Sequence, residues 1–193
     1  TKNYNIMRKT IVTMNCFTIM SSICTAQEEL KINTSKSSIQ WFGEYTFYFG
    51  GHEGFINFKE GYFIKNNDSI TGGEFIIDMN SITNTDIKKK KANNGLINHL
   101  KDTDFFDVKK HPLAKLAITS VEYFENNEGR IYANLTIKSV TKAIRFNVRF
   151  NYPEKELKAK FKIDRTDWDI NYKSKIKDGA ISDAIGFLVS IKL

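Results

Sequence analysis

The stretch RFNVRF at residues 145–150 decides the fold, because polar and apolar side chains alternate along its whole length. On a β-strand, neighbouring side chains point to opposite faces, so Phe146, Val148 and Phe150 would share one face and the polar side chains the other. The stretch GFLVSIKL at 186–193 repeats the pattern. This periodicity of two predicts strands that turn one apolar face toward a core.

Shorter alternating runs recur along the chain after residue 30, separated by turn-forming residues such as NND at 66–68 and NNEG at 126–129. They cover residues 39–49, 52–58, 61–64, 73–78, 116–124, 131–137 and 159–163. One segment, 86–101, is instead compatible with a helix and predicts one or two short helices near residues 86–106. Many short antiparallel strands with a single helical insertion predict a mainly β fold, a barrel or a sandwich, rather than a βαβ arrangement.

The composition is that of one folded domain. The chain has 193 residues, and no repeat, linker or low-complexity tract divides it. Hydrophobic residues make up 41% of the chain, with 15 Phe against 2 Pro, which excludes a disordered protein.

Residues 1–26 have the features of a secretory signal peptide. A basic pair at 8–9 precedes a mostly apolar stretch at 11–23, and small residues follow it. We therefore expect cleavage near Ala26 and a periplasmic or secreted protein whose single domain covers 27–193. A retained anchor or a disordered arm is the alternative.

Both cysteines, Cys16 and Cys24, lie inside this N-terminal segment. Its removal would leave no thiol, which would exclude disulfides, thiolate metal sites and a cysteine nucleophile. Lipid attachment at Cys24 is disfavoured, because the bulky Ile23 stands where a lipoprotein signal has a small residue.

The net charge of +7 is partly carried by the same segment, which holds three basic residues and no acid, so the remainder carries +4. The charges are scattered except for four lysines at 88–91. This pattern lacks the basic stripe of a nucleic-acid-binding protein. A short lysine run favours a solvated face; the alternative is a basic face that contacts a membrane surface or an acidic partner.

Several strings in the chain together resemble the YceI-like family of polyisoprenoid-binding periplasmic proteins, in the family's order over residues 30 to 193. These strings are Trp41 followed by HEG at 52–54, GGEFIIDMNSI at 72–82, LINHL at 96–100, DFFDV at 104–108, HPLA at 111–114, LTIKSVTK at 135–142 and FKIDRTDW at 161–168. The chain departs from the family at Ser139, where Gly is common, and at Ala143, where Pro is common. Both positions lie in a predicted hairpin turn, whose shape they would affect more than binding.

The resemblance implies a lipocalin-like, up-and-down antiparallel β-barrel of about eight strands. It also implies an elongated apolar channel that binds, carries or stores an isoprenoid, a quinone tail or a similar lipid, without catalysis and without another cofactor. An eight-stranded barrel can enclose one small ligand. A homodimer and a peripheral membrane contact stay open.

Periodicity alone does not separate a channel wall from a filled core, and the resemblance favours the channel. The predicted channel residues are Phe47, Phe49, Phe58, Phe75, Ile77, Phe105, Phe106, Leu135, Ile137, Phe146, Val148 and Phe187. Among them, Phe105 and Phe106 would either close one end of the channel or plug the barrel end.

Arg165 has two interpretations. It could meet a ligand head group at the barrel mouth, or it could pair with its acidic neighbours, Asp164 and Asp167, at the end of a strand.

A catalytic or metal site finds little support in the sequence. No serine-centred elbow, Cys-His pair or phosphate loop is present, and His52, His99 and His111 lack metal-ligand spacing. An enzyme that acts on a lipid or quinone would need an inward polar pair. Such a pair would come from Tyr45, Tyr132, Arg165 or Asp167.

Overall fold

A computed structural model describes residues 27–45, 50–172 and 181–193, with the side chains of Tyr45 and Ile181 left out. Its elements are β1 (Gln27–Lys31), β2 (Ser38–Tyr45), β3 (Gly51–Asn66), β4 (Ser69–Asp78), η1 (Met79–Ser81), α1 (Lys90–Lys101), β5 (Leu113–Tyr123), β6 (Glu128–Ile137), β7 (Val140–Asn151), β8 (Glu156–Asp164), η2 (Arg165–Trp168) and β9 (Ile181–Lys192). The elements η1 and η2 are short 3₁₀ helices.

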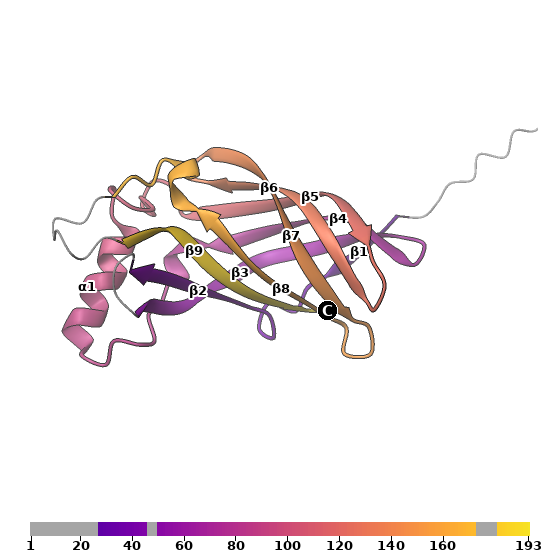
Figure 1. The fold of residues 1–193 in the computed structure, drawn as a ribbon, viewed down its shortest axis with the longest axis horizontal. Coiled ribbons are helices and arrows are strands. Elements are labelled where there is room, and N and C mark those ends of the chain that lie inside the picture. The colour runs from indigo at the N-terminus through magenta and orange to yellow at the C-terminus, as the bar shows by residue number, and fades with distance from the viewer. Residues whose placement is uncertain (1–26, 46–49, 173–180) are drawn as a thin grey trace, which may run out of the picture.

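Strands β2 to β9 form a closed barrel (Figure 1). Each strand pairs antiparallel with the next one in the chain, and β9 also pairs with β2, which closes the ring. Strand β1 lies outside this ring and pairs with β3 at residues 62–66, while β2 pairs with β3 at residues 51–56. The predicted up-and-down antiparallel barrel of about eight strands is confirmed.

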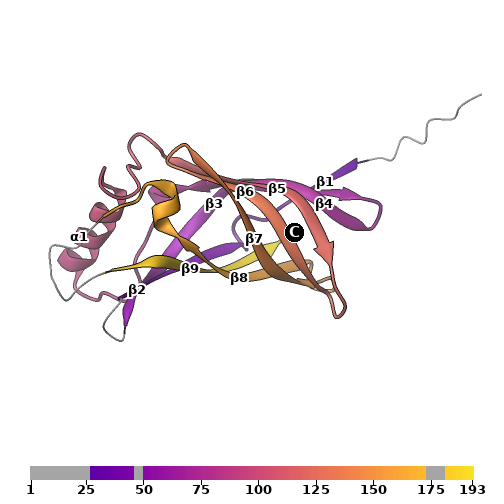
Figure 2. The same cartoon turned by 45° about the horizontal axis from the view of Figure 1, so that its top comes forward.

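The two ends of the barrel differ. One end carries α1 and is called here the helical end; the other carries the β3–β4, β5–β6 and β7–β8 hairpins and is called the hairpin end (Figures 1 and 2). Helix α1 confirms the predicted helical insertion near residues 86–106.

Two details differ from the sequence-based expectations. The runs at 52–58 and 61–64 form the single strand β3, which a bulge between Phe58 and Glu60 bends. Ala143 lies within β7, where it pairs with Asn134, and is not part of the turn. The turn itself consists of Lys138 and Ser139, both with positive φ, which suits a two-residue hairpin.

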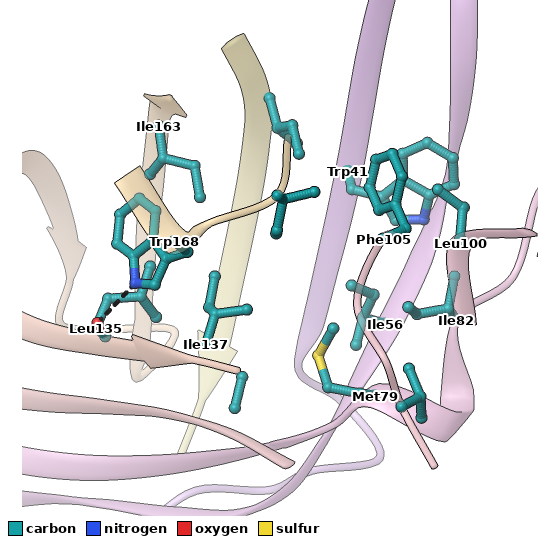
Figure 3. Packing of buried hydrophobic residues seen from close by; sticks show 14 residues of the cluster. Trp41, Ile56, Met79, Ile82, Leu100, Phe105, Leu135, Ile137, Ile163 and Trp168 are labelled. Carbon is teal, nitrogen blue, oxygen red and sulfur yellow. Dashed lines mark hydrogen bonds between the residues drawn. The ribbon is translucent and has the colours of Figure 1, made fainter. Parts of the chain in front are cut away.

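The alternating side chains meet inside the barrel, as expected from periodicity. Along β7, Phe146, Val148 and Phe150 are buried and the residues between them are exposed. The buried residues form two clusters. The helical-end cluster includes Trp41, Ile56, Met79, Leu135, Ile137, Ile163 and Trp168, and the hairpin-end cluster includes Phe58, Phe63, Phe75, Ile131, Phe146, Val148 and Ile191. Figure 3 shows the helical-end cluster.

Trp41 and Gly54 fasten the segment after η1 to the wall of the barrel. Thr83 and Thr85 donate backbone hydrogen bonds to β3, where β4 has already left it. The indole Nε1 of Trp41 donates to the carbonyl of Thr83 at 3.1 Å, and a Cβ on Gly54 would collide with that same carbonyl. The tryptophan and the glycine of the family strings therefore serve the architecture.

Candidate functional site

An apolar channel runs inside the barrel and receives side chains from all eight of its strands. Among the described residues, the acidic and basic side chains in its wall are those of Glu44, His52, His99 and Arg165. The rest of the wall consists almost wholly of aliphatic and aromatic residues from both buried clusters. Such a wall offers an apolar ligand a transfer out of water and few hydrogen bonds.

The channel is long and narrow. Ile185, Phe187, Val189 and Ile191 of β9 all line it, and they span about 20 Å of strand at about 3.3 Å per residue. Its volume is ≈ 170 Å³. That is close to the roughly 150 Å³ of an engineered apolar cavity that binds benzene, but here the space is drawn out along the strands. The shape therefore suits a hydrocarbon chain better than a bulky ring system.

The structure places nine of the twelve predicted channel residues in the wall. These are Phe58, Phe75, Ile77, Phe105, Phe106, Leu135, Ile137, Phe146 and Phe187. Val148 is buried in the hairpin-end cluster and is not part of the channel wall. Phe47 and Phe49 lie outside the described residues. Whether the nine residues touch a ligand stays a prediction.

Some wall residues were missed although their sequence carried a signal. Ile185 stands two positions before Phe187 and continues its alternation. Leu96, His99 and Leu100 are spaced three and four apart on α1, so they share the helix face that closes the helical end. Only the fold shows that this face meets the channel.

Phe105 and Phe106 lie at the helical end of the channel. Their rings contact each other at a centroid distance of 4.9 Å, and Phe105 is buried. Both rings form part of the wall, and their closing the channel or plugging the barrel end stays a prediction.

One interpretation expected Arg165 to pair with its acidic neighbours in the chain, and the structure does not show this pairing. Residues 165–168 form η2 instead of a strand end, with Asp164 as its N-cap, and Asp167 is exposed. Hydrogen bonds from the hydroxyl and the backbone N–H of Thr166 hold the pKa of Asp164 below its ordinary value. The guanidinium of Arg165 turns inward and forms an ion pair with Asp183 at 2.7 Å.

An enzyme that acts on a lipid or quinone would need an inward polar pair from Tyr45, Tyr132, Arg165 or Asp167. The described part of the chain does not bring such a pair together. Tyr132 points away from the channel and donates to Glu122 at 3.2 Å, and Asp167 is exposed. The side chain of Tyr45 lies outside the described residues. Of the three whose side chains are described, Arg165 alone lines the channel.

Residues 27–45, 50–172 and 181–193, the described part of the chain, also bear on metal binding and on membrane spanning. No cluster of three His, Cys, Asp or Glu side chains there could hold a metal ion. No helix in these segments has the length and hydropathy to span a bilayer. The lysines at 88–91 are exposed, and their role as a basic face stays a prediction.

His52 and Asp86 form a polar pair beside the channel. Nδ1 of His52 lies 2.8 Å from the Asp86 carboxylate, which also accepts hydrogen bonds from the backbone N–H of Glu53 and the amide of Asn84. Burial alone would raise the pKa of Asp86, but the hydrogen bonds from Glu53, His52 and Asn84 outweigh it and hold the pKa below its ordinary value.

The pair makes stability depend on pH. A carboxyl whose pKa is depressed by folding stabilises the protein above its unfolded pKa of about 3.9, and this contribution is lost as the pH falls through the folded value. We expect Asp86→Asn to lower the free energy of unfolding by about 1 kcal/mol at neutral pH and by much less near pH 3. Urea denaturation of both proteins at the two pH values measures this. A difference that grows toward acid would contradict the assignment.

The sequence that folds into this barrel matches a known protein family. The model of the YceI-like domain matches residues 30–193. This chain belongs to the YceI-like family. Its members provide a binding fold, and the apolar channel of this YceI-like barrel fits a small apolar ligand.

Individual relatives are distant. A "UPF0312 protein" of Pseudomonas putida strain KT2440 is 40% identical over 53 residues, and the match spans 28% of each of the two chains. The crystal structure of Burkholderia cenocepacia BcnA has a TM-score of 0.67 at 16% identity and covers 83% of this chain and 98% of BcnA. A Campylobacter jejuni YCEI protein has a TM-score of 0.49 at 23% identity, covering 70% and 82%. At 16% identity, the likeness to BcnA shows a shared fold alone.

Proposed function

We propose that this YceI-like barrel binds a long isoprenoid-type lipid, such as a polyprenyl chain or a quinone tail, and carries or stores it. The observation that carries the proposal is the apolar channel, to which all eight strands contribute and which extends about 20 Å along β9. Each CH₂ group moved from water into such a wall contributes about 0.8 kcal/mol. A long tail would therefore bind tightly with very few polar contacts.

The volume of the channel sets a condition on binding. Pockets for drug-sized ligands have about 300–1,000 Å³, whereas this channel has ≈ 170 Å³. A long tail therefore has to displace side chains that fill the interior. Phe161 and Phe187 are only partly buried and lie in the wall with their ring centroids 5.5 Å apart, so their rings are the first candidates to turn aside.

The cellular place of this activity is part of the proposal. A signal peptide at residues 1–26 would deliver the barrel to the periplasm or the exterior, where a lipid in transit needs shelter from water. These residues lie outside the described part of the chain.

The experiment that tests the proposal examines the full chain purified from the cells that make it, without detergent. Native mass spectrometry should show a mass excess, and organic extraction should release an apolar molecule in a ratio near one per chain. A protein that repeatedly yields no apolar molecule, and whose interior is solidly filled when its structure is determined experimentally, would refute the proposal.

A further inference from the structure

Two buried nitrogen atoms at the helical end of the channel have no hydrogen-bond partner among the described residues. They are Nε of Arg165 and Nε2 of His99, and both side chains form part of the channel wall. A buried polar group without a partner costs about 1–3 kcal/mol, and folded proteins retain few of them. Two such atoms in one wall indicate a partner that arrives with the ligand.

The two side chains belong to one cluster around Phe105. The guanidinium carbon of Arg165 lies 6.0 Å from the centroid of the Phe105 ring, and the ring of His99 lies 5.9 Å from it. Tyr172 joins them: its ring contacts His99 at 4.5 Å, and its carbonyl accepts a hydrogen bond from Nη2 of Arg165 at 3.0 Å. The helix α1, the 3₁₀ helix η2 and residue 172 thus converge on one place.

The charges in this cluster are already balanced. Arg165 is 4% exposed, and its two terminal nitrogens donate to the carbonyls of Ile170 and Tyr172 and to the carboxylate of Asp183. The carboxylate of Asp104 lies 3.8 Å from Nδ1 of His99. An anionic head group would meet at least as much negative as positive charge here, whereas a neutral oxygen atom needs only the Nε–H of Arg165.

We infer that Arg165 and His99 form a polar subsite for a neutral oxygen acceptor, a carbonyl or hydroxyl group, at one end of the apolar ligand. The inference rests on the proposed function and adds an orientation to it. The oxygen-bearing end lies at the helical end, after the ring of Phe105 has turned away from the two nitrogens, and the tail extends toward the hairpin-end cluster. Arg165 Nε donates one hydrogen bond to that oxygen, and Nε2 of His99 either donates a second one to a carbonyl or accepts one from a hydroxyl group.

The test compares three probes that share a farnesyl tail: farnesene, which has no oxygen, farnesyl acetone, which has a ketone, and farnesyl phosphate, which is an anion. Binding to the ligand-free full chain is measured by quenching of tryptophan fluorescence. One additional hydrogen bond should make the ketone bind about three- to tenfold more tightly than the hydrocarbon, and the phosphate should bind more weakly than the ketone.

Two variants locate the effect. His99→Phe keeps a ring against Phe105 and Tyr172 but removes Nε2, and Arg165→Lys keeps the charge but removes Nε. Both should lose the preference for the ketone over farnesene, whatever their affinity for the hydrocarbon itself. The matched control His111→Phe changes a histidine that is not part of the channel wall and should keep the preference.

The outcomes separate the two claims. Failure of all three probes to bind would overturn the proposed function itself. Binding of farnesene together with an equal affinity for the ketone, or a preference that persists in His99→Phe, would overturn the subsite alone. Tightest binding of the phosphate would overturn its neutral character.

Discussion

Replacing Trp168 with alanine is expected to lower the free energy of unfolding by about 4 kcal/mol. Trp168 is 1% exposed, and its indole fills the helical end of the barrel against Leu135 and its neighbours (Figure 3). Its Nε1 donates to the carbonyl of Leu135 at 3.0 Å. The alanine variant loses the packed ring and the hydrogen bond that Nε1 donates. Urea denaturation followed by circular dichroism measures the loss.

Trp168→Phe is the matched control for this experiment. It retains most of the ring volume and removes only the indole N–H, so its loss should be nearer 1–2 kcal/mol. A loss below about 1 kcal/mol in Trp168→Ala would show that the helical end is not packed as described.

Blocking the channel with Ala159→Phe is expected to weaken the binding of farnesene at least tenfold. Ala159 lies on β8 with its methyl group in the channel wall. A phenyl ring there would occupy part of a channel of only ≈ 170 Å³ and stand in the path of the tail. Because the ring enters existing space, the thermal midpoint should change by only a few degrees. Titration of the ligand-free protein with farnesene checks the affinity.

Lys160→Phe places the same ring on the next residue, which is exposed on the outer face of β8. This variant should bind farnesene like the parent protein. Equal binding by Ala159→Phe and Lys160→Phe would mean that the ligand does not lie inside the barrel.

The strands were predictable from the sequence because their signal is local. Alternation along 145–150 and 186–193 assigns each side chain to a face without any knowledge of its neighbours. The closure of the ring has no such signal, since β2 and β9 pair across most of the chain. Periodicity alone thus allowed a sandwich as well as a barrel, and the family strings decided between them.

The polar end of the candidate site was only partly predictable. Arg165 stood out between its acids, but the sequence did not reveal that Asp164 caps a 3₁₀ helix, which turns the guanidinium inward to Asp183. His99 looked like any helical residue, because its position at the channel depends on where α1 meets the barrel. Whether a channel remains inside the barrel depends on the summed volume of the inward side chains from all eight strands. A short stretch of sequence does not contain this information.

Helix α1 begins with no side-chain cap and no acidic residue in its first turn, and only Leu100 among its residues is buried. Lysines at 90 and 91 oppose the dipole at this end of the helix. The helix that covers one end of the barrel thus has few local anchors, whereas the strands around it are joined into a closed ring by hydrogen bonds. Local unfolding of α1 would open this end of the channel without separating any pair of strands. A ligand could therefore enter at a small fraction of the free energy that opening the barrel itself would demand.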